Sequence, residues 1–264
     1  MLITNPFSEV SSTIPSIALQ LFVIVMIVLV VAGTLFDIAH KKNMKYFFEN
    51  YKKAKNAATK KLGSTEVASI VTKTVASDIL TTAELGAGQR RAAHLLGMYG
   101  SIIFWISSAI MIFCYASPDE NTPNIFPLMW HIGAIMTCLG GDWFWFFLRV
   151  DVSAEANPWH RIVRADLFVL SLLAAATLGL IWSYLQSAGV LGWDKLFLVL
   201  FGLSNILLFG GVYWSKFAHM FYKPGAAIQK NLSEADGFRD DLPPPADKPK
   251  QFGLGIKRES PKHY

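Results

Sequence analysis

Two histidines stand at the ends of long apolar segments, where side chains from neighbouring helices can share a ligand. His94 lies in GQRRAAHLLGMYG, one residue before an apolar run, and His219 lies in YWSKFAHMFYKPG, just beyond another. Two neutral imidazoles that face each other across adjacent helices are what bis-histidine ligation of a haem iron requires. The alternative is that each histidine is an interfacial residue, a common place for a half-polar ring.

Three cations accompany these histidines. Arg90, Arg91 and Lys216 would lie at the water edge, where haem propionates need positive charge. The five residues together predict a site for one haem b, with His94 and His219 as the metal ligands.

A carboxylate within an apolar run is the second unusual group. Asp142 lies in GGDWFWFF, beside Gly140, Gly141, Trp143 and Trp145. An intramembrane carboxylate needs a partner or a water-filled cleft, and flat aromatic side chains next to glycines suit a quinone ring. Asp142 is therefore a candidate proton relay for an exchangeable quinone. The alternative is an ion pair with Arg149 or with an arginine of the loop that follows.

Three other histidines have less specific surroundings. We expect His131, within the third apolar run, to hydrogen-bond inside the helix bundle, and a site shared with Met111 is the alternative. His160 lies in ANPWHRIVR and is interpreted as a loop residue, with a replacement ligand or a proton relay as alternatives. His40 follows the first run among lysines, at the expected lipid surface.

The composition of the chain is that of a membrane protein. Of the 264 residues, 53% are hydrophobic and only 16% are charged, against about 25% charged in soluble domains. A bilayer core about 30 Å thick takes roughly 20 apolar residues per helix. Five runs are long enough: Ile17 to Asp37, Leu95 to Ala116, Ile125 to Leu148, Leu167 to Gln186 and Leu196 to Phe217. The sequence predicts an all-α integral membrane bundle of five transmembrane helices, a multi-pass protein of the cell inner (cytoplasmic) membrane.

The distribution of charge predicts the orientation of the helices. Of the 24 Lys and Arg residues, 23 fall in the first loop, the third loop and the tail from Lys216, and only Lys195 falls on the other side. We therefore expect the N-terminus outside and the C-terminus in the cytoplasm. The predicted parts are an outer N-terminus with the first span (1–38), a basic cytoplasmic helical loop (39–93), a four-helix membrane domain (94–222) and an extended cytoplasmic tail (223–264).

Several functions are excluded by the sequence. It has no Walker loop, no GxGxxG after a strand and no HExxH motif, and Cys114 and Cys138 alone cannot build a four-cysteine zinc site or an iron–sulfur cluster. The net charge of +5 lies at the flanks of apolar runs. No nucleic-acid partner is therefore expected.

Three motifs of this chain resemble a known family. RRAAHLLGMYG, GAIMTCLGGDWFWFFLR and WSKFAHMFYKPGAA are similar to segments of cytochrome b subunits of the nitrate reductase gamma type. Within that group they most resemble membrane subunits of sulfur metabolism: the quinone-interacting oxidoreductase C-subunit, heterodisulfide-reductase-like proteins and the membrane anchor of adenylylsulfate (APS) reductase. The absence of a fused ferredoxin domain favours the anchor. The resemblance implies an electron-transfer subunit that links cytoplasmic adenylylsulfate reductase alpha and beta subunits, or a related flavin and iron–sulfur oxidoreductase, to membrane quinone.

One departure from the family limits the expected cofactor content. Relatives with two haems carry a second histidine pair, at positions where this chain has Phe104 and Phe201. The resemblance therefore implies at most one haem, held by His94 and His219. A purely structural, haem-free anchor is the competing interpretation, and whether the chain itself reacts with quinone is left open. A small transporter is a third class, which the lack of internal repeat halves disfavours.

Overall fold

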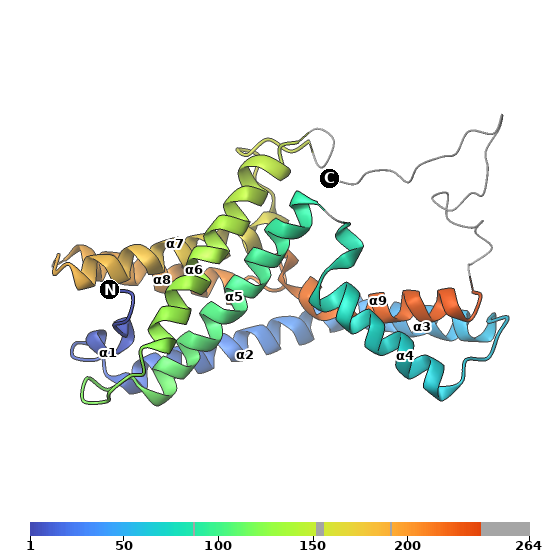
Figure 1. Cartoon of the computed structure of the whole chain (residues 1–264), viewed down its shortest axis with the longest axis horizontal. Coiled ribbons are helices and arrows are strands. Elements are labelled where there is room, and N and C mark those ends of the chain that lie inside the picture. Colours follow the sequence, from blue (N-terminus) through green and yellow to red (C-terminus); the bar gives the residue numbers. More distant parts are fainter. Residues whose placement is uncertain (87, 152–155, 191, 239–264) are drawn as a thin grey trace. The chain divides into compact units, whose positions relative to one another are not determined.

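The computed structural model describes residues 1–86, 88–151, 156–190 and 192–238. All regular elements within these ranges are helices (Figure 1). They belong to two compact units, each described by itself. The membrane unit is Met1–His40 with Ala92–Ala218, and the loop unit is Lys41–Arg91 with the described part of His219–Tyr264.

The membrane unit contains the long apolar helices. Its elements are α1 (Pro6–Val10), most of α2 (Ser16–Lys41) and of α5 (Gln89–Cys114), α6 (Ile125–Trp143) with the π-helical turn η3 (Phe144–Leu148), the 3-10 turn η4 (Arg164–Asp166), α7 (Leu167–Ser187), α8 (Trp193–Gly210) and the 3-10 turn η5 (Lys216–Ala218).

Four of the described helices are long and apolar enough to cross a membrane. They are Ser16–Lys41, Gln89–Cys114, Arg164–Ser187 and Trp193–Gly210, and they correspond to the first, second, fourth and fifth predicted spans. These helices indicate a multi-pass membrane protein. α6 and η3 have the predicted bounds of the third span, but α6 is not among the four, so the third span and the orientation stay predictions.

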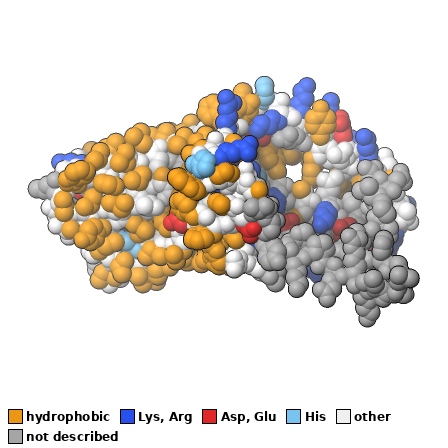
Figure 2. Space-filling model, turned by 90° about the horizontal axis from the view of Figure 1, so that it is seen from above, with side chains coloured by type: hydrophobic (Ala, Val, Ile, Leu, Met, Phe, Trp, Pro, Cys, Tyr) orange, Lys and Arg blue, Asp and Glu red, His pale blue; other side chains and the backbone are white. Residues whose placement is uncertain are grey.

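The surface of α2 indicates an apolar environment. Hydrophobic side chains are exposed along much of its length, including Ile17, Leu21, Val28 and Leu35, and Figure 2 shows hydrophobic side chains over much of the visible face of the long helices. A continuous exposed apolar surface of this kind is unfavourable in water and suits contact with lipid tails.

Glycines bring α5 and α6 into backbone contact. A Cβ added at Gly100 would lie 2.6 Å from the backbone nitrogen of Thr137, and one added at Gly133 would lie 2.7 Å from that of Phe104. A Cβ added at Gly140 would lie 2.5 Å from the carbonyl oxygen of Ala93. No side chain fits at these three positions, and the two helices run side by side (Figure 1).

The short helix α1 packs into one end of the bundle. The Asn5 side chain caps α1 by accepting from the backbone N–H of Phe7 at 3.0 Å, and it donates to the Tyr115 carbonyl at 2.8 Å. The Phe7 ring is buried, with ring centroids 5.9 Å from Trp130 and 5.4 Å from Trp182. Helix α1 is therefore part of the core.

The fifth predicted span ends earlier than expected. Leu196 to Phe217 was predicted as one helix, but α8 ends at Gly210 and Gly211 follows it as the C-cap. Two adjacent glycines weaken a helix, because each gains freedom in the unfolded chain and adds no side-chain contact. The turns that follow, and η5, separate α8 from His219.

The loop unit consists of short helices. Its elements are α3 (Asn43–Asn56), α4 (Ser64–Thr74), the π-helical turn η1 (Val75–Leu80), the 3-10 turn η2 (Ala83–Leu85) and α9 (His219–Ala235). The helical character predicted for the basic loop is thus present.

Part of the tail is helical, which corrects the prediction of an extended segment from residue 223. Residues 223–235 belong to α9, which tolerates Pro224 near its start. The Asn231 amide donates to the Thr74 hydroxyl and to Asp78, both at 2.8 Å, and Lys223 pairs with Glu84. Packing against α4 and η1 therefore stabilises α9. The proline-rich part of the tail, from residue 239, lies outside the described residues.

The Asp78 carboxylate makes the docking of α9 pH-dependent. Hydrogen bonds from Asn231 and then Ser77 hold the pKa of Asp78 below its ordinary value. A depressed folded-state pKa means that the stabilisation is present above the unfolded pKa, about 3.9, and is lost as pH falls through the folded value. We expect hydrogen exchange in α9 to accelerate below about pH 4. Asp78→Asn, which keeps an acceptor oxygen but does not titrate, should remove this pH dependence, and an unchanged acid response in that variant would contradict the assignment.

Candidate functional site

His94 lies on a helix face that has room beside it. It is the sixth residue of α5 and is half-buried. One turn further along, a Cβ added at Gly97 would meet nothing within 4 Å. An imidazole next to open space is accessible to a ligand.

The same face of α5 continues to Trp105. Eleven residues separate it from His94, which is about three helical turns. The Trp105 ring packs against Phe209 and Phe217, with centroids 5.5 and 6.4 Å away, and its indole N–H is buried without an acceptor among the described residues. This face therefore offers aromatic surface and one hydrogen-bond donor.

His219 is the first residue of α9 and is exposed. It belongs to the loop unit, whereas His94 belongs to the membrane unit. The pairing of the two imidazoles stays a prediction. The alternative interpretation, two separate interfacial histidines, also remains.

The predicted propionate partners lie at helix starts. Arg90 and Arg91 are in the first turn of α5, and Lys216 begins η5 and is exposed. The Arg91 Nε donates to the Thr81 carbonyl at 2.7 Å, so part of that guanidinium is committed to the loop unit.

The place of a second histidine pair is filled by aromatic side chains. The rings of Phe104 and Phe201 contact each other with centroids 6.3 Å apart. Trp130 packs against Phe104 at 5.0 Å, and Trp182 stacks on Phe201 at 5.6 Å. All four side chains are buried in one core cluster, so this volume holds protein side chains.

Asp142 lies on the outward face of α6. It is exposed, and it follows the exposed side chains of Ile135 and Leu139 at helical spacing, with exposed Phe146 one turn beyond. Within the described part of the chain Asp142 has no hydrogen bond or ion pair. The alternative of a pair with Arg149 is wrong, because Arg149 is paired with Asp166 at 2.6 Å.

Most of the residues around Asp142 pack against other parts of the protein. Gly140 packs on α5, and a Cβ added at Gly141 would lie 2.5 Å from the Leu173 side chain. Trp145 is buried, and the Arg149 guanidinium covers its ring at 4.1 Å from the centroid. Of the predicted quinone surface, half-buried Trp143 and the Asp142 carboxylate remain accessible.

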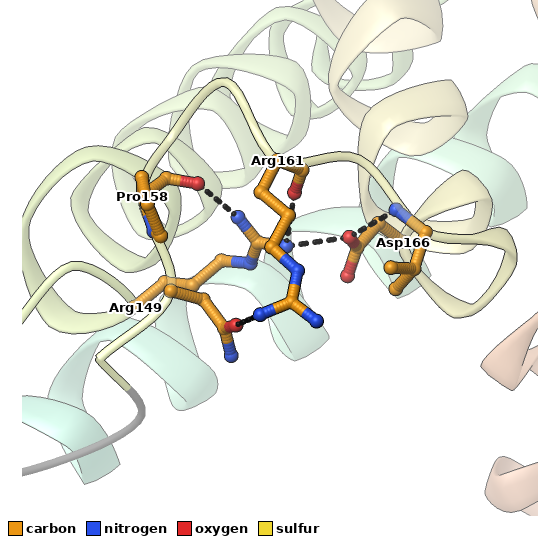
Figure 3. A network of polar contacts seen from close by, with 6 residues as sticks. Arg149, Pro158, Arg161 and Asp166 are labelled. Atoms are coloured by element: carbon orange, nitrogen blue, oxygen red, sulfur yellow. Dashed lines mark hydrogen bonds and ion pairs between the residues drawn. The ribbon is translucent and has the colours of Figure 1, made fainter.

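Arg149 forms a buried network that the sequence did not reveal (Figure 3). Its side chain donates to the carbonyls of Pro158 and Arg161 at 2.9 and 2.7 Å and to Asp166. Asp166 also accepts from the backbone N–H of Val163 at 3.0 Å. Arg149 is only 2% exposed, so it is not the ordinary interfacial residue that its position at a helix end suggests. It holds residues 158–161 of the loop that precedes η4.

Loss of the Arg149 side chain should destabilise the membrane unit strongly. Arg149→Met leaves the Asp166 carboxylate and two carbonyls without their donor, and breaking a buried ion pair costs about 3 to 5 kcal/mol. We expect a clearly lower temperature of thermal unfolding in detergent. Arg161→Gln is the matched control, because the Arg161 side chain is exposed and makes one long bond of 3.4 Å, to Asn157. Equal unfolding temperatures for the two variants would contradict the role of Arg149.

His131 is a structural residue, as expected. It is fully buried, with Nδ1 at 2.7 Å from the Pro127 carbonyl and Nε2 at 2.9 Å from the Ser183 hydroxyl. A carbonyl only accepts, so Nδ1 donates to it and the neutral ring accepts from Ser183 at Nε2. Both ring nitrogens are thus used between α6 and α7. His160 is exposed in its loop.

Asp37 is a buried carboxylate that sequence reasoning missed. It is 1% exposed, one turn before the end of α2. The neighbouring residues of α2 pack against the segment after α8: Gly33 lies close to Val212, and the rings of Phe36 and His40 contact Tyr213. Its position at the edge of an apolar run was the available signal, since charges inside a span are costly and point to a function.

Comparison with known protein families, with curated proteins and with solved structures finds no match to this chain. The chain is a helical, multi-pass membrane protein with a histidine and a carboxylate at the surfaces of two of its long helices.

Proposed function

We propose that this protein anchors a cytoplasmic oxidoreductase at the inner membrane and exchanges electrons between that enzyme and quinone, through one haem b ligated by His94 and His219. The enzyme is of the adenylylsulfate reductase type, with alpha and beta subunits. The placement of His94 carries the proposal: it lies in the second turn of a candidate span, on a face with open space at Gly97 and an unused donor at Trp105.

Each residue of the site has a defined task in this proposal. The imidazoles of His94 and His219 bind the metal, and Arg90, Arg91 and Lys216 neutralise the propionates. Trp105 and its aromatic neighbours exclude water from this face. When bound, the haem supplies one-electron transfer. Asp142 accepts a proton when a quinol is oxidised or donates one when a quinone is reduced.

The partner enzyme is proposed to dock on the basic loop unit. Exposed lysines line α3, including Lys45, Lys52, Lys53 and Lys55, and an acidic partner surface would be attracted to them. Interactions of this kind weaken in salt. The polar docking surface and the apolar helices together suit an anchor.

The test is a spectrum of the protein purified from its own membranes together with its bound partner. We expect a reduced-minus-oxidised alpha band near about 560 nm, typical of bis-histidine haem b, at one haem per chain. We also expect a flavin and iron–sulfur enzyme to copurify at low salt. A colourless protein that still retains the enzyme would leave the purely structural anchor, and a chain with neither haem nor enzyme would overturn both interpretations.

A further inference from the structure

The loop before α7 presents both apolar and basic side chains. Trp159, Ile162 and Val163 are 58, 60 and 44% exposed. The side chains of His160, Arg161 and Arg164 between and beside them are also exposed. The eight residues 157–164 thus form a surface that is partly apolar and partly positively charged. We call this segment the interfacial loop.

Hydrogen bonds hold the backbone of the interfacial loop in place. The Arg149 side chain binds the backbone of the interfacial loop by donating hydrogen bonds to the carbonyls of Pro158 and Arg161 (Figure 3). Asp166 holds the N–H of Val163, and Arg161 N–H donates to the Pro158 carbonyl at 3.0 Å. A buried ion pair thus holds the backbone from which the exposed side chains project, so the backbone part of the ordering cost is met before any ligand binds.

The interfacial loop lies between two helical segments with exposed apolar side chains. A candidate span begins at Arg164 itself. On the other side, η3 ends at Leu148, and its side chains Phe146 and Phe147 are exposed. Tryptophan and arginine are the residues typical of the headgroup layer, where an apolar body and a polar end are both accommodated.

We propose that the interfacial loop binds the headgroup layer of anionic phospholipids. Trp159, Ile162 and Val163 insert among the upper acyl chains, while Arg161 and Arg164 bind lipid phosphates. An acidic soluble protein would pair with the two arginines but would not reach apolar side chains at the depth where a span begins. The loop therefore adds a lipid-dependent contact to the membrane anchor, independent of haem and of quinone.

The experiment places an environment-sensitive fluorophore on the loop of the full-length protein in nanodiscs. Ile162→Cys is labelled in a background with Cys114→Ser and Cys138→Ala, and Ser64→Cys, exposed at the start of α4, is the matched control. The discs contain phosphatidylcholine alone or phosphatidylcholine with phosphatidylglycerol, with a lipid that carries a spin label high on its acyl chain. We expect the probe at position 162, and not that at 64, to shift to the blue and to be quenched by the spin-labelled lipid.

The lipid charge is tested separately. Arg161→Gln and Arg164→Gln should each lower the preference for phosphatidylglycerol about fivefold, because each arginine near an anionic surface contributes roughly 1 kcal/mol. A probe at position 162 that is quenched by aqueous iodide as strongly as the probe at 64 would overturn the proposal. Insertion with no dependence on phosphatidylglycerol would overturn the binding of anionic headgroups, and a blue shift only on addition of the partner enzyme would assign the loop to protein docking instead.

Discussion

We expect His94→Leu to remove all bound haem from the purified protein. Loss of one axial ligand from a bis-histidine site leaves the iron with a single protein bond, and leucine fills the adjacent space with apolar atoms. His219→Leu should have the same effect, because the proposed bis-histidine site requires both ligands. The measurement is the haem content per chain, taken from the reduced-minus-oxidised spectrum at equal protein concentration.

His160→Leu is the matched control for this prediction. His160 is exposed in the interfacial loop and should leave the haem content unchanged. Thermal unfolding of all three variants distinguishes loss of a ligand from loss of the fold. Full haem content in a stable His94→Leu or His219→Leu protein would exclude the proposed pair.

Gly100→Ala should separate α5 from α6 and strongly destabilise the membrane unit. The new methyl carbon would lie 2.6 Å from a backbone nitrogen and 2.8 Å from a backbone oxygen of α6. Backbone atoms within a helix cannot give way as a flexible side chain can, so the helices must move apart along their contact. Forcing extra atoms into a packed interface costs about 1 to 3 kcal/mol or more, and the measurement is thermal unfolding in detergent. Gly133→Ala should behave alike, since its contact is the reciprocal one.

Gly97→Ala provides a control within the same helix. Three residues before Gly100, a Cβ has nothing within 4 Å, and alanine favours a helix over glycine by up to about 1 kcal/mol. We therefore expect Gly97→Ala to be neutral or slightly stabilising. A Gly100→Ala protein as stable as Gly97→Ala would mean that α5 and α6 are not in backbone contact.

The spans that rest on unbroken apolar runs were predicted well from the sequence. α5 and α7 begin and end within a few residues of the predicted bounds, apart from the first turn of α5, which is polar. The end of α8 and the helical α9 were predicted wrongly for local reasons. Hydropathy does not register the two glycines that stop α8, and the polar composition of the tail does not reveal the contacts with α4 and η1 that stabilise α9.

The roles of residues that depend on partners distant in the sequence were harder to predict. The intrabundle role of His131 followed from its lone position in a span, but Ser183, 52 residues away, was not predictable. Arg149 suggested an interfacial cation because its acceptor Asp166 lies 17 residues further along. In both cases the partner is brought close by the packing of helices, which one sequence does not specify.

The burial of Phe7 also has a consequence for biogenesis. Phe7 is made well before Trp130 and Trp182, so its cavity is completed only when both tryptophans have been made. The hydrogen bond from Gln186 to the Pro6 carbonyl spans 180 residues. Until α7 is inserted, Phe7 and Pro6 lack their contacts with Trp182 and Gln186. Packing at this end of the bundle is thus completed late in assembly, and a bulky insertion close to Asn5 would interfere with this packing more than with insertion of the helices.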